Sequence, residues 1–373
     1  MKIEMNVSGT SKSVKMAANV IKPKPIAEEM GGIEINAGAD GVVMLKASNG
    51  DYELIRRVEA NVKEPGKVLL DGKRLAAIFG SVSGETMVIE TSEGKPNATL
   101  KCGGSRFTVA ILPGELPEKQ EVDKAEAVTM EIGCVELLDG LSHVRYAMAK
   151  EGPRTGLMGV LARIGNGNVT LVALDGFKMG LARKACMETN GERDVTIPAE
   201  AVNQIAAMCA DAGENETVYV EVDEKAIRVT TENAELVSSL IAEKFVDYRA
   251  VIPRDAATSA RFDASMFIAA MKRASIAAPN NLFRLAVRDG EMEISSNDLT
   301  KTIAFSEAIP CQKMGGDIET AYNLTYMLET MNAVGTSEAQ LDLTGALSPG
   351  VIKPVDGGKE LHVLLPVRVV GST

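Results

Sequence analysis

Tryptophan is absent from this 373-residue chain, and aromatic residues make up only 4% of it. Proteins that bind single-stranded nucleic acid commonly stack the bases on aromatic side chains, so this composition argues against such a platform. Histidine occurs only twice, at His143 and His362, which are far apart in the sequence. A metal cluster built from several histidines, or a set of several catalytic histidines, is therefore excluded.

Cysteine is also sparse. The five cysteines are odd in number, widely scattered and without a Cys-x-x-Cys pair: Cys102, Cys134, Cys186, Cys209 and Cys311. This pattern argues against a disulfide framework and against a zinc site, and we interpret these thiols as buried or idle. No apolar run approaches the roughly 20 residues that span a bilayer, and no basic segment precedes an apolar stretch at the N-terminus. We therefore expect a cytoplasmic protein with no membrane partner and no metal.

Motifs of phosphate loops, dinucleotide-binding turns, zinc proteases and serine hydrolases are missing. The Gly-Asn-Gly-Asn stretch at 165–168 is flanked by strand-like runs and predicts a hairpin turn. Asp175 could act as a general acid or base, but the sequence supplies no partner for it, and an Asp-Gly residue usually shapes a turn. We therefore expect a binding protein without a cofactor. A three-domain enzyme with a site between domains around Asp175 stays open as an alternative.

The chain repeats itself. A strand-turn-strand pattern begins at Val42, Val169 and Met292, and a strand leading into an apolar-periodic helix begins at Lys67, Asp194 and Asp317; both patterns recur with spacings of 127 and 123 residues. A third pattern, two strands near the end of each copy, covers 98–113, 226–241 and 351–366. Such agreement predicts three tandem copies of one domain, at 1–120, 126–252 and 257–373. Polar linkers are expected at 113–126 and around 252–260.

Each copy is expected to contain two helices on antiparallel strands, which is an α+β plan with six helices. The first helix of each copy is predicted within 8–20, 133–150 and 263–278, beginning at Ser8 or Gly9, Gly133 and Asp263. The second carries apolar residues at helical spacing: Leu75, Ile78 and Phe79; Val202, Ile205 and Met208; Leu324, Met327, Leu328 and Met331.

The formal net charge of −11 counts against a nucleic-acid partner unless basic residues are gathered in one place. The six predicted helices and their ends carry nine basic residues and six acids, a sum of +3. The acids are Asp71, Glu136, Asp139, Glu200, Asp263 and Glu329. A surface that faces phosphate would need this bias, but lysine and arginine are also good helix formers on solvated faces. From charge alone the two interpretations are about even.

Three segments together resemble the bacterial sliding clamp, the beta subunit of DNA polymerase III: LVALDGFKMGLA at 171–182, KFVDYRAVIP at 244–253 and LHVLLPVRV at 361–369. Their order and spacing fit that family, and the repeat extends the resemblance over essentially the whole chain. The resemblance implies three tandem clamp-type domains, each with two helices packed on antiparallel sheets, and a head-to-tail homodimer closed into a ring. The helices would line a hole for duplex DNA, which decides the charge question in favour of phosphate contact.

The function implied by the resemblance is that of a non-catalytic processivity factor in DNA replication. It would encircle duplex DNA without sequence preference. A protein that slides must contact the phosphates and not particular bases, because base contacts would hold it at one sequence. Short linear motifs would tether the catalytic subunit of DNA polymerase III, the clamp loader and other proteins. The location would be the bacterial cytoplasm, with nucleoid association during replication. A clamp-like paralogue that no longer tethers to DNA stays open.

Residues expected at these contacts follow from the family segments and from the predicted helices. For DNA they are Lys12, Lys15, Lys22, Lys24, Lys73, Arg74, Arg145, Lys150, Arg154, Lys272 and Arg273. For the peptide pocket they are Leu157, Leu174, Gly176, Phe177, Met179, Val246, Val251, Asn323, Tyr326, Leu347, Ser348, Val363, Leu364, Leu365, Pro366, Val367 and Arg368. For the dimer contact they are Arg106, Phe107, Val109, Ile276 and Ala277.

Several positions depart from the family pattern. Phe177 and Lys178 stand where the family usually has His-Arg, and Val246 and Ala250 replace a proline and an arginine. The loss of a basic side chain at the pocket edge predicts that preferred peptides are more apolar or simply different. Acidic residues of the dimer contact are replaced by Ile303 and Ser306, so we expect an interface that leans on apolar contact. The tail at 370–373 runs past the usual end and is expected across or beside the pocket.

Overall fold

The computed structural model describes residues 1–118, 121–297 and 302–368. The chain divides into two compact units, one formed by 1–135, 187–191 and 203–240, the other by 136–186, 192–202 and 241–373. The middle repeat therefore contributes strands to both units, because each of its sheets continues into a neighbouring repeat. The domain boundaries expected from the sequence stay a prediction. No helix in the described part of the chain is long and apolar enough to cross a membrane.

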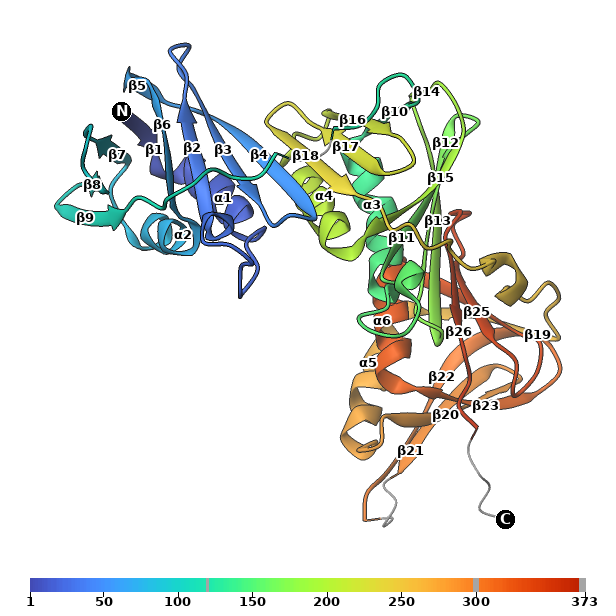
Figure 1. The fold of residues 1–373 in the computed structure, drawn as a ribbon. Helices are drawn as coiled ribbons and strands as arrows, with labels where there is room; N and C mark the ends of the chain where they lie inside the picture. The colour runs from blue at the N-terminus through green and yellow to red at the C-terminus, as the bar shows by residue number, and fades with distance from the viewer. Residues whose placement is uncertain (119–120, 298–301, 369–373) are drawn as a thin grey trace. The chain divides into compact units, whose positions relative to one another are not determined.

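The first unit contains a nine-stranded and a five-stranded antiparallel sheet (Figure 1). The nine strands follow the order β14 (Glu188–Thr189), β10 (Val128–Gly133), β16 (Thr217–Val222), β17 (Ala226–Thr230), β18 (Ala234–Ser239), β4 (Tyr52–Glu59), β3 (Val42–Ser48), β2 (Gly32–Ala37) and β6 (Gly66–Asp71). The five are β5 (Asn61–Glu64), β1 (Lys2–Asn6), β7 (Thr86–Thr91), β8 (Asn97–Cys102) and β9 (Ser105–Ala110). Pairing of β18 with β4 joins the second repeat to the first.

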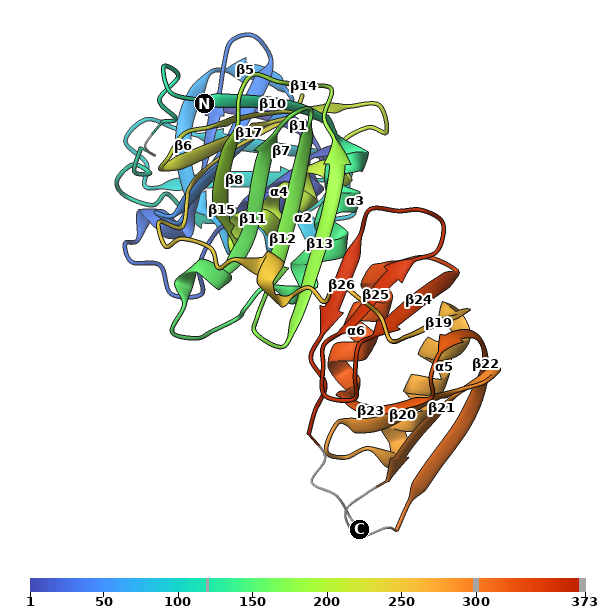
Figure 2. The same cartoon turned by 90° about the vertical axis from the view of Figure 1, so that its right-hand side faces the viewer.

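The second unit contains a twelve-stranded sheet, in which β13 and β26 lie side by side (Figure 2). The order is β15 (Arg193–Pro198), β11 (Gly159–Gly165), β12 (Asn168–Leu174), β13 (Lys178–Ala185), β26 (Leu361–Leu364), β25 (Gly350–Pro354), β24 (Glu338–Leu343), β19 (Thr258–Asp263), β22 (Ala304–Gly315), β21 (Glu291–Asn297), β20 (Leu282–Arg288) and β23 (Ile318–Asn323). The long strand β22 pairs with β21 through 304–310 and with β19 through 311–315. Its first half therefore has one open edge within the described residues.

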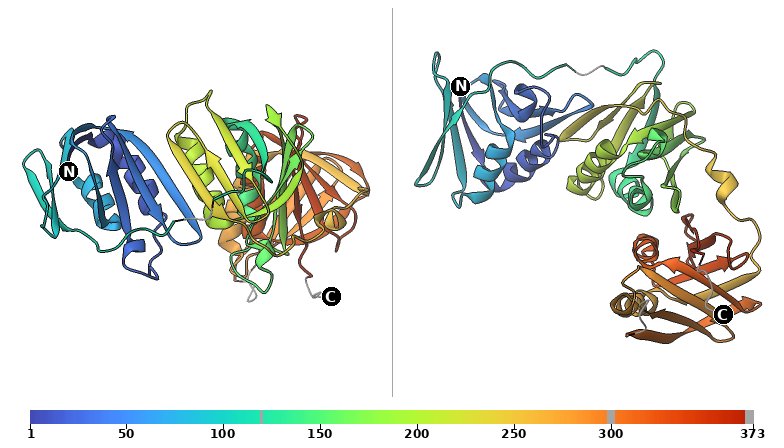
Figure 3. Two further views of the ribbon diagram at one scale, coloured as in Figure 1. Left: turned by 45° about the horizontal axis from the view of Figure 1, so that its top comes forward. Right: turned by 60° about the horizontal axis from the view of Figure 1, so that its bottom comes forward.

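Six α-helices are present in the described residues, as the sequence predicts. They are α1 (Val7–Ala18), α2 (Gly72–Ser81), α3 (Cys134–Val144), α4 (Ala199–Asp211), α5 (Ala264–Ala274) and α6 (Leu324–Val334). In each of the outer repeats the two helices pack against each other, α1 on α2 and α5 on α6, beside the strands (Figure 3). Their apolar faces are buried: Phe267, Met327 and Met331 lie in one core with Phe283 and Tyr322. The α+β plan of three similar domains is confirmed.

Helix ends differ from the predictions in detail. The first helix begins at Val7 instead of Ser8 or Gly9, because the side chain of Asn6 caps it by accepting a hydrogen bond from Gly9 N–H at 2.9 Å. Asp263 caps α5 as predicted. The helices expected within 133–150 and 263–278 end early, at Val144 and Ala274, and each continues as a short 3₁₀ turn, Arg145–Ala147 and Ser275–Ala277.

Two turn and linker predictions have clear outcomes. The hairpin at 165–168 is confirmed: it joins β11 to β12, with Asn166 and Gly167 at φ of 53° and 68°. These left-handed angles are those of the two-residue turn that suits the twist of paired strands. The linker expected around 252–260 is too long, because Thr258 already begins β19, whose residues pair on both sides with β22 and β24.

Candidate functional site

The junction of β13 with β26 carries an apolar cluster on one face of the twelve-stranded sheet. Met179 lies opposite Val363 in the register of the two strands. The buried members of this group, here named the β13–β26 cluster, are Leu157, Leu161, Val172, Leu174, Met179, Phe245, Tyr248 and Val363. Val246 is half-buried against them. Five residues predicted for the peptide pocket, at positions 157, 174, 179, 246 and 363, are thus brought together from four separate segments of the chain.

Leu364 lies on the other side of the sheet. Side chains alternate along a strand, so the neighbour of Val363 points to the opposite face. Leu364 is fully buried in the core that contains Phe267 and Met327. Its place in the peptide pocket stays a prediction, while its side chain belongs to the core on the helix side of the sheet.

The turn between β12 and β13 is shaped by Asp175. Its Oδ1 accepts hydrogen bonds from the backbone N–H groups of Phe177 and Lys178, both at 2.9 Å. Gly176 has a φ of +91°, a conformation that favours glycine over residues with a side chain. The prediction that Asp175 shapes the turn is confirmed, and as a result the backbone that presents Phe177 is held at two points.

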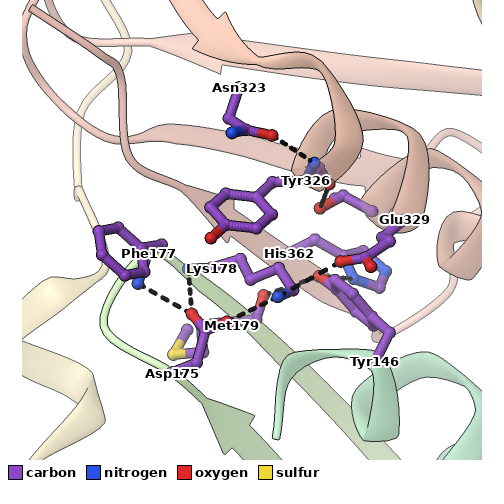
Figure 4. A network of polar contacts seen from close by, with 10 residues as sticks. Tyr146, Asp175, Phe177, Lys178, Met179, Asn323, Tyr326, Glu329 and His362 are labelled. Atoms are coloured by element: carbon purple, nitrogen blue, oxygen red, sulfur yellow. Dashed lines mark hydrogen bonds and ion pairs between the residues drawn. The ribbon is translucent and has the colours of Figure 1, made fainter. Parts of the chain in front are cut away.

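Asp175 does have a partner, contrary to the sequence prediction. Its Oδ2 lies 2.6 Å from Nζ of Lys178, and the same ammonium group lies 3.3 Å from Oε2 of Glu329 on α6 (Figure 4). Burial by itself lowers the pKa of Lys178, but the hydrogen bond and charge of Asp175, with a further contribution from Glu329, outweigh it and raise the pKa. Lys178 therefore stays charged, and its charge is balanced by the carboxylates of Asp175 and Glu329.

Phe177 and Tyr326 form an aromatic pair above this ion cluster. Their ring centroids are 5.8 Å apart, and Nζ of Lys178 lies 4.5 Å from the centroid of the Tyr326 ring. Phe177 is 57% exposed, although it is a large apolar residue. The amide oxygen of Asn323 caps α6 by accepting a hydrogen bond from Tyr326 N–H at 3.0 Å, as Figure 4 shows. The predicted residues Asn323 and Tyr326 therefore lie beside the turn of β12 and β13.

The segment after β26 runs along this aromatic pair. Leu365 N–H donates to the carbonyl oxygen of Phe177 at 2.9 Å, and Val367 N–H donates to that of Ala321 at 2.8 Å. Pro366 is half-buried and Arg368 is exposed. Leu347, on the loop before β25, is 62% exposed, Val251 also exposes much of its side chain, and Ser348 is half-buried. The tail at 370–373 lies outside the described residues.

Behind the surface lies a buried polar group that the sequence did not indicate. Tyr146 donates a hydrogen bond to the carbonyl oxygen of Met179 at 3.1 Å, and its hydroxyl lies 3.1 Å from Nδ1 of His362. Desolvation, together with the nearby His143, lowers the pKa of His362 to about 3, so its ring is neutral at physiological pH. No sequence signal linked these residues, because they are more than 200 positions apart.

A second lysine bridge lies further along β13. Asp139, His143 and Glu360 each bring a potential metal-ligand atom into one small volume. The ammonium group of Lys184 lies 2.5 Å from carboxylate oxygens of both Asp139 and Glu360. The ammonium group of Lys184 thus already binds both carboxylates of this cluster and ties β13 to α3 and to the segment before β26.

The residues predicted for DNA contact lie on helices and on the loops that follow them. Several are already ion-paired: Lys12 with Asp211 at 2.6 Å, Lys22 with Asp51 at 2.5 Å, Arg74 with Asp71 at 3.8 Å, and Arg273 with Glu307 at 2.5 Å. Lys73 donates to the carbonyl oxygen of Lys22 at 3.4 Å. Within the described ranges, five others are exposed and make no ion pair: Lys15, Lys24, Arg145, Lys150 and Lys272. Arg154 is exposed. The pKa of the nearby Glu243 is lowered mainly by hydrogen bonds from the Thr155 hydroxyl and the Gly156 N–H, and the charge of Arg154 adds a smaller contribution.

The residues predicted for the dimer contact lie at two sheet edges or beside them. Arg106, Phe107 and Val109 belong to β9, the outer strand of the five-stranded sheet, with Val109 buried and Arg106 exposed. Ile276 is 73% exposed on the 3₁₀ turn after α5, where Ala277 is buried. The outer edge of β9 and the open edge of β22 at 304–310 carry unpaired backbone groups in the described residues. Each edge can therefore accept another strand.

Comparison with known proteins follows the same division into repeats. Profiles of the DNA polymerase III beta subunit match in order: the N-terminal domain over residues 1–118, the central domain over 133–247 and the C-terminal domain over 249–368. The beta sliding clamp of Caulobacter vibrioides is 26% identical, over 99% of this chain and 100% of that protein.

Solved structures share the fold. The sliding clamp of Pseudomonas aeruginosa bound to griselimycin has a TM-score of 0.91 at 22% identity, covering 99% of this chain and 100% of that chain. The DNA polymerase III beta subunit of Thermotoga maritima has a TM-score of 0.90 at 20% identity, covering 99% of both. Because the profiles match all three repeats of the chain, this protein belongs to the DNA polymerase III beta subunit family, the sliding clamps.

Proposed function

We propose that two copies of this chain close head to tail into a ring around duplex DNA and hold the replicative polymerase on its template. The observation that carries the proposal is the ordered match of three beta-subunit domains over nearly the whole chain. The protein acts as a non-catalytic accessory subunit. An enzyme centred on Asp175 is not favoured, because that carboxylate is bound to Lys178 and to two backbone N–H groups.

DNA contact is assigned to the cations on the helices, and on the loops that follow them, that have no carboxylate partner in the described residues. Lys15, Lys24, Arg145, Lys150 and Lys272 can each neutralise a phosphate without breaking an ion pair. Lys12, Lys22, Arg74 and Arg273 must first release an acid, which weakens their contribution. An overall charge of −11 disfavours DNA on the rest of the surface, and this keeps contact confined to the basic residues.

The β13–β26 cluster and the adjacent aromatic pair are assigned to short linear motifs of partner proteins. A buried apolar group with exposed apolar residues at its rim can take one or two side chains of such a motif. We propose that the catalytic subunit of DNA polymerase III and the clamp loader carry these motifs. We assign the same surface to other replication and repair proteins that carry a motif of this kind.

Ring closure is assigned to the open edges of β9 and of β22 at 304–310, with Phe107 and Ile276 supplying apolar contact. Light scattering at several protein concentrations tests this assignment. A mass of twice the 39.5 kDa chain that holds on dilution is expected. Replacing half-exposed Phe107 by aspartate is expected to give the monomer mass. A Phe107→Asp protein that stays dimeric would contradict the assigned contact, and a monomeric wild-type chain would contradict the closed ring.

A further inference from the structure

Asp139 and His143 lie on the same face of α3. They are four positions apart, so their side chains meet, and Nε2 of His143 lies 3.5 Å from Oδ1 of Asp139. The end of α3 lies close against β13, because a Cβ added to Gly180 would lie only 2.5 Å from the carbonyl oxygen of His143. The backbone that carries the pair is therefore held in place by the packing of the helix on the sheet.

A backbone carbonyl fixes which nitrogen of the His143 ring carries the hydrogen. Nδ1 lies 2.5 Å from the carbonyl oxygen of Ala333, which can only accept a hydrogen bond, so Nδ1 is the donor. Ala333 lies in the last turn of α6, where carbonyl groups have no partner within the helix. In the neutral ring the lone pair of Nε2 therefore faces an oxygen of Asp139 that is also an acceptor. A metal ion or a proton between the two atoms would satisfy both.

Glu360, in the segment before β26, adds a third ligand atom. An oxygen of Glu360, an oxygen of Asp139 and a ring nitrogen of His143 all lie within 4.8 Å of one another. In a tetrahedral zinc site with bonds of roughly 2 Å, the ligand atoms lie about 3.3 Å apart, which is close to the distance between Asp139 and His143. Glu360 is buried, whereas the side chain of Asp139 is 51% exposed, so the group is anchored on one side and open to water on the other.

A cation of the protein already lies between the two carboxylates. Nζ of Lys184 is 2.5 Å from an oxygen of Asp139 and 2.5 Å from an oxygen of Glu360. One ammonium group for two carboxylates leaves an excess of negative charge. A divalent ion in its place would balance both carboxylates and would also bind Nε2 of His143. The side chain of Lys184 is 17% exposed, so its ammonium group can turn to water.

We propose that Asp139, His143 and Glu360 bind a divalent transition-metal ion, with zinc as the best match, water as the fourth ligand and Lys184 as the competing cation. One imidazole nitrogen with two carboxylates suits zinc better than magnesium or calcium, which prefer oxygen ligands. The bound ion ties α3 of the middle repeat to the segment before β26 of the last repeat, and so stabilises the junction between them. Because Lys184 must leave, we expect weaker binding than at a site without a competing cation.

Metal titrations of the full-length protein, prepared free of metal, test the site. Calorimetry should show one zinc ion bound per chain, and cobalt bound in its place should give the visible absorption of a tetrahedral site, which added zinc abolishes. Asp139→Asn changes an exposed ligand at constant size and is expected to weaken zinc binding at least about tenfold. His143→Ala should weaken it by about a hundredfold, since even changes behind the ligands of metal sites cost about 10- to 100-fold.

Both of these variants keep all five cysteines, so they are matched controls for zinc bound to thiols. Zinc that binds equally well to the wild-type protein, to Asp139→Asn and to His143→Ala would be adventitious, and the proposal would be overturned. A wild-type protein that binds no zinc would overturn it as well.

Lys184→Met separates a metal site from a purely structural ion cluster. Without metal this variant leaves two carboxylates unpaired and is expected to melt at a lower temperature than the wild-type protein. Zinc should bind it several-fold more tightly, because the competing cation is gone, and should raise its melting temperature more than that of the wild-type protein. If zinc leaves the melting temperature of Lys184→Met unchanged, the cluster is structural, with a proton on Nε2, and the proposal fails. Binding by Lys184→Met alone would also overturn it, since Lys184 would then keep the ion out of the wild-type chain.

Discussion

Two strand junctions join consecutive repeats, and they use the same backbone arrangement with different side chains. In the first unit β18 pairs antiparallel with β4, and in the second β13 pairs antiparallel with β26. On the face of the β18–β4 sheet turned away from α1, oppositely charged residues alternate across the strands, as in the pairs Arg57–Glu235, Lys46–Glu53 and Arg228–Glu221. The corresponding face at β13–β26 carries the apolar cluster.

The strand pairing joins the repeats in the same way at both junctions. The side chains on the outer face differ, and they determine whether that face is covered by ion pairs or carries an apolar cluster. Paired charges are satisfied among themselves, and Arg57 and Glu235 keep 35% and 25% of their side chains exposed, so the outer face of the first junction is covered by ion pairs. The exposed apolar residues beside the second junction, among them Phe177, Val251 and Leu365, gain free energy when they are covered.

The helix side of both junctions carries shared ion pairs. In the first, Arg56 and Lys12 both bind the single acid Asp211; in the second, Lys178 lies between two acids, Asp175 and Glu329.

The largest effect is expected from removing the buried cation of the second junction. Lys178→Met leaves the carboxylates of Asp175 and Glu329 without their counter-charge in a poorly hydrated place. We expect a loss of about 2–3 kcal/mol in the free energy of unfolding, because an unpaired buried charge is costly. Urea unfolding at neutral pH measures it. A loss below about 0.5 kcal/mol would mean that water reaches these carboxylates freely.

The next largest effect is expected on stability at acidic pH, and it comes from His362 on β26 at the second junction. The folded protein keeps His362 neutral down to a pKa of about 3, whereas the unfolded chain protonates it at its ordinary pKa near 6.5. Above pH 6.5 neither state binds this proton; as the pH falls below that value the unfolded state gains it alone, so stability is lost by about 1.4 kcal/mol per pH unit.

His362→Asn removes this titration and keeps a hydrogen-bonding group near Tyr146. Between pH 6.5 and 5 the wild-type protein should lose about 2 kcal/mol more than His362→Asn, a difference that follows from the slope above. Unfolding curves of both proteins at several pH values test the difference. Parallel curves would show that His362 is not shielded from protonation in the folded state.

The outer charges of the first junction should matter least for stability. Arg57→Met breaks an ion pair whose side chains are 35% and 25% exposed. Such pairs contribute about 0–1 kcal/mol, so this variant is the matched control for Lys178→Met under the same conditions. If Arg57→Met costs as much as Lys178→Met, the contrast between a solvated and a buried charge pair does not hold.

A smaller contrast of the same kind is expected among the cations that we propose to contact DNA. Replacing an unpaired cation such as Lys15 or Lys272 by alanine should reduce the slope of log affinity against log salt by about 0.9, the value for one phosphate contact. Replacing Arg273, which is bound to Glu307 through two nitrogens, should change it less. Titrations of duplex DNA at several salt concentrations measure the slopes. Equal changes at Lys272 and Arg273 would remove the distinction.

The sequence predicted what depends on local periodicity. The threefold repeat, the six helices, the hairpin at 165–168 and the role of Asp175 in its turn all follow from residue spacing and turn chemistry, and the structure contains each of them. The placement of Val363 and Leu364 on opposite faces of the sheet follows from the strand periodicity as well.

Long-range pairs could not be predicted. Glu329 is 151 positions from Lys178, and Asp211 is 199 from Lys12, so nothing local shows that they meet. The consequence is largest at the turn between β12 and β13, where the sequence shows no partner for Lys178 on α6 and the structure places Glu329 beside it. Likewise Asn6 was overlooked as the cap of α1 because Ser8 and Gly9 are also good first residues.

The central claim is that the protein is linked to DNA by topology and not by affinity. The most direct measurement loads it on a nicked circular duplex with the clamp loader of its host, isolates the complex by gel filtration, and then cuts the circle once. The account predicts that the protein stays with the circle through gel filtration and leaves within minutes after the cut, by sliding off the ends. Retention that is the same before and after the cut, whether good or poor, would contradict it.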